Sequence, residues 1–170
     1  METSVLSQAI ADGVQVIVLV NHSADPLLQE YVFVRDATDR GAGTGICKYG
    51  LAGGAINTGE SRDKAIEREC IEELGLEITP VYHSSFTKLR PGGYTNMNHL
   101  YFSYIPTPLS LCTNDTEEVS GLEIFTLQQV IALYEKGLVH EGSIRLLFHY
   151  LNCSEEGSLN EPATFEKWTF

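Results

Sequence analysis

The stretch Gly54-Ala-Ile-Asn-Thr-Gly-Glu-Ser-Arg-Asp-Lys-Ala-Ile-Glu-Arg-Glu-Cys-Ile-Glu-Glu-Leu-Gly-Leu76 decides the fold of this chain. Its second half predicts a helix over residues 62–74, because that run is built from good helix formers. Ser61 stands at the N-cap position, and Gly75 occupies the position that commonly ends a helix. We therefore expect a glycine-rich loop, a helix and a second loop in immediate succession.

Two arcs of this helix have opposite chemistry. A four-residue spacing places three apolar side chains on one stripe, which should pack on a β-sheet: Ile66, Cys70 and Leu74. Three carboxylates fall on the adjoining arc: Glu69, Glu72 and Glu73. Like charges at these spacings cost roughly 0.2–0.5 kcal/mol per pair unless a cation lies among them. Clustered carboxylate oxygens favour Mg²⁺ or Mn²⁺, so the helix is predicted to form one wall of a metal and phosphate site.

The sequence around this helix predicts an α/β domain. Residues 14–20 and 30–35 are rich in β-branched residues and should pair as a hairpin. Seven glycines between residues 36 and 59 predict a loop with one short strand at most. Residues 78–89 and 97–105 should form two more strands around a turn at Pro91. Helices are expected at residues 127–136, after a cap at Thr126, and at residues 143–152.

Length and composition limit the possible functions. The 170 residues, 43% of them hydrophobic, suit one globular domain, which we place at residues 1–155 with a tail at 156–170. The net charge of −12 disfavours nucleic acid as a partner. No apolar run is long enough for a membrane helix and no signal peptide is visible, so a cytoplasmic protein without a membrane partner is expected. The four cysteines show no zinc or redox spacing.

The opening stretch contains a complete family motif. It has Gly54, then Glu60 after five residues, then Arg68-Glu69-Cys70-x-Glu72-Glu73-x-Gly75-Leu76 after seven more. This pattern resembles the Nudix box of the Nudix hydrolase family, with every fixed letter present. The resemblance implies an α/β/α sandwich around a mixed β-sheet. It also implies hydrolysis of a nucleoside diphosphate linked to another group, by attack of water on phosphorus.

Position in the box implies a role for each residue. Glu69 and Glu73 are expected to be the principal ligands of Mg²⁺, with Mn²⁺ as an alternative, and Glu72 a further ligand. The carbonyl of Gly53 would supply a backbone ligand. Arg68 should orient the carboxylates through its guanidinium fork, and Glu60 should either serve a second ion or brace Arg68.

Two details resemble ADP-ribose pyrophosphatases within the family. The box is entered through Ala52-Gly53-Gly54, and Pro91 lies fifteen residues beyond Leu76. One detail differs, because Gly50 and Leu51 stand where that subfamily usually has a glutamate. We therefore expect ADP-ribose or a related nucleoside-diphosphate sugar as substrate. The alternatives are a nucleoside triphosphate, a diadenosine polyphosphate, or a nucleotide-sensing domain that does not cleave its ligand.

The general base and the anion-binding residues are assigned by position. Members of that subfamily often take the base from a mobile loop before the penultimate helix, where this chain has Asp115, Glu117, Glu118 and Glu123. Glu118 or Glu117 is our candidate, and Glu69 is the alternative. Arg90 beside Pro91 is preferred over Arg35 for binding the diphosphate, and Tyr94 and Phe86 could stack on a base. Subfamily members are often homodimers, and an aromatic tail makes a dimer plausible here: Phe165, Trp168 and Phe170.

Overall fold

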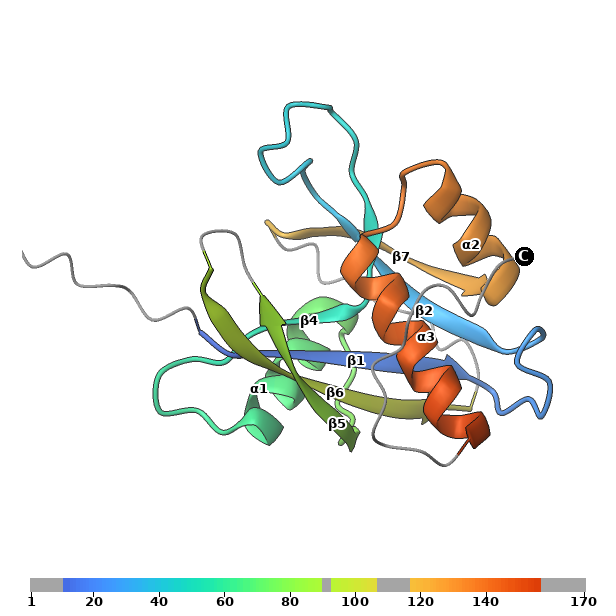
Figure 1. The fold of residues 1–170 in the computed structure, drawn as a ribbon, viewed down its shortest axis with the longest axis horizontal. Helices are drawn as coiled ribbons and strands as arrows, with labels where there is room; N and C mark the ends of the chain where they lie inside the picture. Colours follow the sequence, from blue (N-terminus) through green and yellow to red (C-terminus); the bar gives the residue numbers. More distant parts are fainter. Residues whose placement is uncertain (1–10, 90–92, 107–116, 157–170) are drawn as a thin grey trace, which may run out of the picture.

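The computed structural model describes residues 11–89, 93–106 and 117–156 (Figure 1). The expectations that concern Arg90, Pro91, Asp115 and the tail aromatics lie outside these residues. The elements, in chain order, are β1 (Gly13–Val20), β2 (Glu30–Asp36), β3 (Tyr49–Gly50), β4 (Ala52–Ala55), α1 (Arg62–Glu69), the π-helical turn η1 (Cys70–Leu74), β5 (Val81–Leu89), β6 (Thr95–Ile105), β7 (Val119–Thr126), α2 (Leu127–Glu135) and α3 (Glu141–Glu156).

Strand β1 organises a mixed sheet formed by the seven described strands. Along one edge β1 pairs with β6 in parallel over its whole length. Along the other edge its second half pairs antiparallel with β2, which confirms the predicted hairpin, and its first half pairs antiparallel with β4. The sheet therefore forks at the middle of β1, and the segment that contains β3 and β4 enters the fork.

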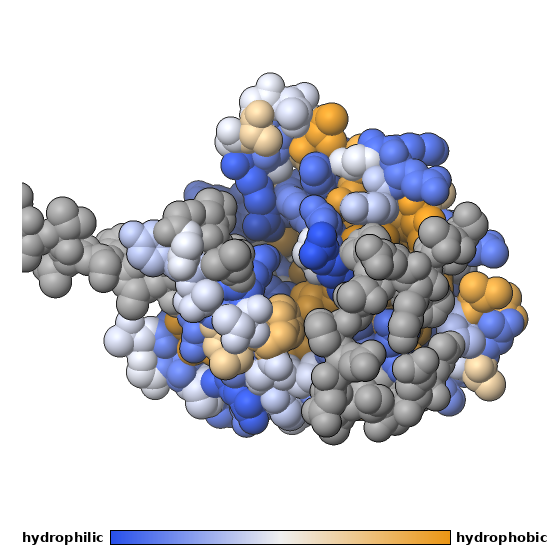
Figure 2. Space-filling model, viewed as in Figure 1, coloured by the Kyte–Doolittle hydropathy of each residue, from blue (hydrophilic) through white to orange (hydrophobic). Residues whose placement is uncertain are grey.

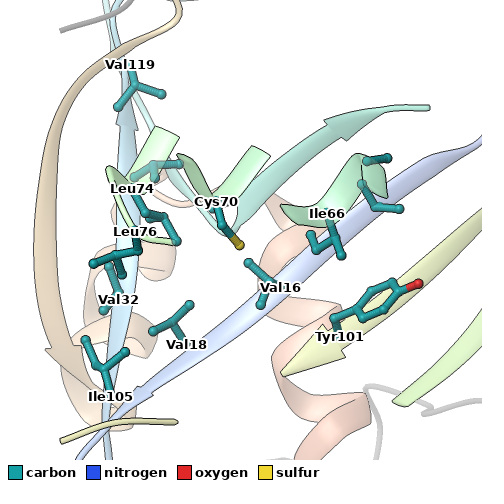
Figure 3. Close-up of a cluster of buried hydrophobic side chains, with 14 of the residues drawn as sticks. Val16, Val18, Val32, Ile66, Cys70, Leu74, Leu76, Tyr101, Ile105 and Val119 are labelled. Atoms are coloured by element: carbon teal, nitrogen blue, oxygen red, sulfur yellow. The ribbon is translucent and has the colours of Figure 1, made fainter. Parts of the chain in front are cut away.

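Helix α1 and η1 cover one face of the sheet. The predicted stripe is buried, since Ile66, Cys70 and Leu74 are each at most 1% exposed. These side chains pack on β1 valines such as Val16 and Val18 (Figure 3). Burial raises the pKa of the Cys70 thiol to about 12, so this cysteine acts as a small apolar side chain.

Helices α2 and α3 contribute to a second apolar cluster on the opposite face. Ile17 and Leu100 from the sheet belong to this cluster together with Ile144 and Leu147 from α3. Figure 1 shows α3 crossing in front of the sheet, with α1 behind it. This arrangement is the α/β/α sandwich that the sequence predicted.

The capping residues predicted from the sequence agree with the structure. Ser61 accepts a hydrogen bond from the Lys64 N–H, and Gly75 ends η1 in the left-handed conformation. Thr126 caps α2 with a reciprocal contact to Gln129. Such local signals depend on a few neighbouring residues and are therefore readable from sequence.

Three expectations need correction. The glycine-rich segment holds two short strands, β3 and β4, rather than one at most. The region assigned to a mobile loop before the penultimate helix becomes strand β7 from Val119, and Glu123 lies in that strand opposite Phe33 on β2. The last helix spans residues 141–156 rather than 143–152. Strand pairing with β2 stabilises β7 although glycine and acidic residues interrupt its apolar pattern.

Candidate active site

Gly53 on β4 anchors the first of the box carboxylates. Its N–H donates to Oε2 of Glu73 at 2.8 Å. The residue has φ of 146°, and a Cβ atom there would lie 2.1 Å from the carbonyl oxygen of Val14. Only glycine tolerates both conditions. This position therefore brings the end of the box helix against the strand.

Gly54 makes room for the second carboxylate. A Cβ atom built on Gly54 would lie 2.4 Å from Oε1 of Glu69. Both Glu69 and Glu73 are 6% exposed, so two carboxylates are buried beside β4. The close approach of Glu69 to the backbone explains why β4 needs glycine at this position.

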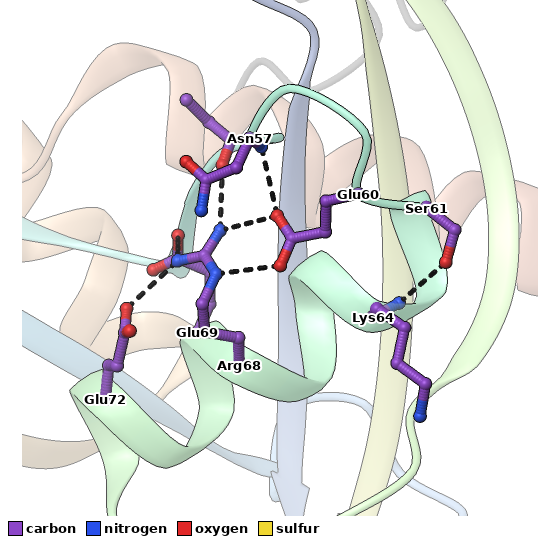
Figure 4. Close-up of polar contacts among 8 residues, drawn as sticks. Asn57, Glu60, Ser61, Lys64, Arg68, Glu69 and Glu72 are labelled. Carbon is purple, nitrogen blue, oxygen red and sulfur yellow. Dashed lines mark hydrogen bonds and ion pairs between the residues drawn. The ribbon is translucent and has the colours of Figure 1, made fainter.

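Arg68 joins the remaining acidic residues (Figure 4). Its guanidinium donates to both carboxylate oxygens of Glu60, at 2.9 and 3.0 Å. It also donates to Glu69 at 2.7 Å, to Glu72 at 3.0 Å and to the carbonyl of Ala55 at 3.0 Å. These contacts raise the pKa of Arg68, led by the hydrogen bonds to Glu60. Arg68 therefore supplies part of the positive charge that the clustered carboxylates require.

The buried carboxylates remain short of positive charge. Burial raises the pKa of Glu73 to about 7, although the Gly53 N–H acts in the opposite direction. Burial likewise raises the pKa of Glu69, against the lowering effect of Arg68. Within the described residues no three acidic, histidine or cysteine side chains converge on a preformed metal site. In this conformation the guanidinium of Arg68 is the cation that contacts Glu60, Glu69 and Glu72.

Glu118 lies at the margin of the same cluster. It is exposed immediately before β7, where its carbonyl accepts the N–H of Ala37. Its charge contributes to raising the pKa values of both Glu69 and Glu73. The structure therefore places this predicted base within electrostatic reach of the carboxylates, beside the equally exposed Glu117.

Arg40 is a candidate anion ligand that the sequence analysis did not single out. Its guanidinium donates to Asp36 at 2.7 Å, and the opposite oxygen of Asp36 lies 2.5 Å from Nε2 of His140. The hydrogen bond to Asp36 raises the pKa of Arg40, and the charges of Glu73 and Glu118 add to this effect. The local sequence signal for this pair is that Asp36, at the end of β2, lies four residues before Arg40.

The other predicted ligands differ in position. Glu60 uses both oxygens on Arg68 and also accepts the Asn57 N–H, so its geometry is that of a brace. Arg35 is exposed on β2 and makes no ion pair with the box carboxylates in the part of the chain described. Tyr94 is 55% exposed, whereas Phe86 packs against the apolar cluster beneath α3.

Comparison with known proteins identifies the family. The model of the NUDIX domain family matches residues 11–166. The chain belongs to the NUDIX family. This match supports the predicted assignment to the pyrophosphatase hydrolases. A search of curated proteins found no significant relative. Within the described part of the chain, no helix is both long and apolar enough to cross a membrane.

Several solved structures share the fold at low identity. A MutT protein from Methanosarcina mazei is 16% identical, with a TM-score of 0.61 over 86% of this chain and 95% of its own. An Ap4A hydrolase from C. elegans is 12% identical, with a TM-score of 0.62 over 88% and 100%. The NUDIX domain of Shewanella oneidensis NrtR, in complex with ADP-ribose, is 15% identical, with a TM-score of 0.64 over 89% and 90%.

Proposed function

We propose that this chain is a Mg²⁺-dependent hydrolase of ADP-ribose or a related nucleoside-diphosphate sugar, releasing AMP and a sugar phosphate. The observation that carries the proposal is the burial of Glu69 and Glu73 beside Gly53 and Gly54, with Arg68 on the adjoining arc. Two buried carboxylates whose pKa values stay raised despite the nearby Arg68 and Arg40 are costly to the fold. A catalytic requirement explains why they are there.

The donor set fits a hard divalent cation. Glu69, Glu73 and the carbonyl of Gly53 would hold Mg²⁺, or Mn²⁺ in its place, and Glu72 would be a further ligand. When bound, such an ion neutralises the diphosphate and lowers the pKa of a coordinated water. Because Glu60 is engaged with Arg68, we assign it to orienting that guanidinium rather than to a second ion.

The attacking water needs a base at the mouth of the carboxylate cluster. Glu118 is our first candidate, because it is exposed and electrostatically coupled to both Glu69 and Glu73. It would take a proton as the water oxygen bonds to phosphorus and the bond from phosphorus to the bridging oxygen breaks. Glu117 and Glu69 are the alternatives.

Positive side chains around the cluster would bind the diphosphate. Arg40 is favoured by its position near Glu73 and Glu118, with Asp36 holding its guanidinium. Arg90 and Pro91 remain candidates from the sequence, and the exposed Arg35 is the weakest of the group. A guanidinium held by a buried carboxylate presents its remaining N–H groups in a fixed direction, which suits phosphate oxygens.

The choice of ADP-ribose rests on the box entry Ala52-Gly53-Gly54 and on Pro91. The NrtR domain, which has the same fold, binds ADP-ribose. The absence of a glutamate at Gly50 or Leu51 keeps the diadenosine polyphosphates and nucleoside triphosphates as the second class. Free thiols at Cys47 and Cys70 suit a reducing compartment such as the cytosol.

A substrate panel tests the proposal. The full chain with Mg²⁺ is incubated with ADP-ribose, a UDP-sugar, ATP and diadenosine tetraphosphate, and the products are separated by ion-exchange chromatography. We expect ADP-ribose to give AMP and ribose 5-phosphate faster than any other compound is cleaved. Faster cleavage of diadenosine tetraphosphate or ATP would transfer the assignment to the second class. Tight binding of ADP-ribose without turnover would identify a sensing domain and refute the hydrolase.

A further inference from the structure

Two buried amide atoms at one end of the sheet have no hydrogen-bond partner. They are Oε1 of Gln15 on β1 and Nδ2 of Asn98 on β6, and Asn98 is only 1% exposed. A third buried polar atom of this kind in the described residues is the hydroxyl of Tyr31, a residue whose backbone pairs with Leu19 at the other end of β1. A buried polar group without a partner destabilises the fold, so the pair near the start of β1 needs an explanation.

The two amides share one face and adjacent strands. Ile17 and Leu100, each two residues further along the same strand, belong to the apolar cluster beneath α3. Since side chains alternate along a strand, Gln15 and Asn98 face the α3 side as well. The parallel register sets Asn98 opposite Gly13, two residues before Gln15. The amides are therefore diagonal neighbours, close enough to contact one small planar group.

Gly13 is built to accommodate Asn98. A Cβ atom on Gly13 would lie 2.6 Å from Oδ1 of Asn98, so any other residue would displace that amide. The Asn98 oxygen is thus seated over the backbone of β1, which leaves Nδ2 as the available donor. The site consequently offers one fixed donor and one nearby acceptor.

The pair lies one strand from the carboxylates. Gln15 is the register partner of Gly53, and the N–H of Gly53 binds Glu73. Phe86, the register partner of Asn98 on β5, adds an aromatic side chain on the same face. Figure 2 shows a recess on this side, between the loop that joins β2 to β3 and the β5–β6 hairpin. Glu73 lies on the α1 side and the amides face α3, but β4 pairs only with β1 among the described strands. A ligand with its diphosphate at Glu73 would therefore reach the α3 side around the other edge of β4, where its attached group would meet the amides.

We propose that Gln15 and Asn98 recognise the adenine base of the substrate. The exocyclic amino group would donate to Oε1 of Gln15, and an adjacent ring nitrogen would accept from Nδ2 of Asn98. Hypoxanthine carries an oxygen in place of that amino group and would meet the Gln15 oxygen with a second acceptor. This inference rests on the proposed function for the position of the diphosphate, and it adds the residues that recognise the base.

Binding of product-like probes tests the inference without turnover. Isothermal titration of the full chain compares AMP, IMP, GMP and ribose 5-phosphate. The expected result is that AMP binds about tenfold more tightly than IMP or GMP, because each unpaired buried group costs about one factor of ten. Equal affinities, or tighter binding of GMP or IMP, would overturn the proposal and leave the amides with a structural role.

Two variants that replace an amide by an apolar side chain of similar shape test whether Gln15 and Asn98 discriminate AMP from IMP. Asn98→Leu and Gln15→Met should each lower AMP affinity about tenfold and bring the AMP to IMP ratio close to one. Thr87→Val on the opposite face of β5 is the matched control and should leave that ratio unchanged. If folded variants kept the wild-type ratio, the amides would not contact the base. A chain that discriminates AMP from IMP but cleaves no diphosphate would refute the proposed function and retain this inference.

Discussion

The two faces of the sheet carry different chemistry at the same end. On the α1 face, Glu69 and Glu73 have more negative charge than Arg68 offsets. On the α3 face, Gln15 and Asn98 are neutral and lack partners. The first face requires a cation, and the second requires a neutral donor and acceptor. Gly53, whose N–H binds Glu73, pairs with Gln15, so we infer that one substrate passing the edge of β4 satisfies both faces.

The largest expected effect is on catalysis from the charged face. Glu69→Gln and Glu73→Gln should each lower kcat about a thousandfold, because a lost metal ligand is worth several kcal/mol in the transition state. Both variants should fold, since each removes a negative charge from a buried cluster. Initial rates with ADP-ribose and Mg²⁺ measure the effect.

Glu67→Gln is the matched control on the same helix. Glu67 pairs with Lys64 at the surface, so this variant should retain activity within about twofold. If Glu67→Gln lost as much activity as Glu73→Gln, the special role of the buried carboxylates would be wrong.

Strand β4, which contains Gly53, is the site of the next largest expected effect. Gly53→Ala should lower the free energy of unfolding by about 4 kcal/mol, because the new Cβ meets the Val14 carbonyl and the backbone is strained. Gly59→Ala also has positive φ, but its Cβ would enter open space, so about 1 kcal/mol is expected. Urea denaturation compares the two, and equal losses would contradict the close approach at Gly53.

The charged face was predictable from sequence because its signals are local. The spacing of Glu69, Glu72 and Glu73 along one helix sets their arc, and Ser61 and Gly75 mark where that helix begins and ends. The resemblance to the Nudix box then pointed to Arg68, and the structure shows it contacting Glu60, Glu69 and Glu72. Whether these side chains perform the assigned roles is left to the experiments above.

The neutral face could not be predicted, because its features depend on register between distant strands. Nothing in the local sequence relates Gln15 to Asn98, which become neighbours only when β1 and β6 pair in parallel. Arg40 was missed because only the folded chain brings it near Glu73 and Glu118 and brings His140 to its partner Asp36. Strand β7 was missed because its pairing with β2 overrides a weak local pattern.

In the metal-free protein, the contribution of Glu73 to folding stability depends on pH. The folded-state pKa of Glu73, about 7, exceeds its ordinary value of 4.5, so its protonated form favours folding. That contribution is complete below pH 4.5 and is lost as pH rises through 7, at a cost of about 3 kcal/mol. In EDTA, Glu73→Gln should therefore unfold at higher temperature than wild type at pH 8, and at nearly the same temperature at pH 4.5. An unchanged difference across this range would show that Glu73 does not titrate as assigned.

The smallest effect concerns the arginine that organises the charged face. Arg68→Lys keeps the charge but cannot maintain simultaneous contacts with Glu60, Glu69 and Glu72, so kcat should fall about fivefold. Arg62→Lys, on the first turn of the same helix, is the control and should be nearly neutral. Wild-type kcat in Arg68→Lys would show that the fork geometry is not needed.

Direct detection of the metal tests the central claim most closely. Electron paramagnetic resonance follows free Mn²⁺ as it is titrated into the full chain with a non-hydrolysable methylene analogue of ADP-ribose. We predict that wild type depletes the free signal and that the Glu69→Gln/Glu73→Gln double variant does not. Equal free Mn²⁺ with both proteins at every concentration would contradict the assignment of these carboxylates as metal ligands.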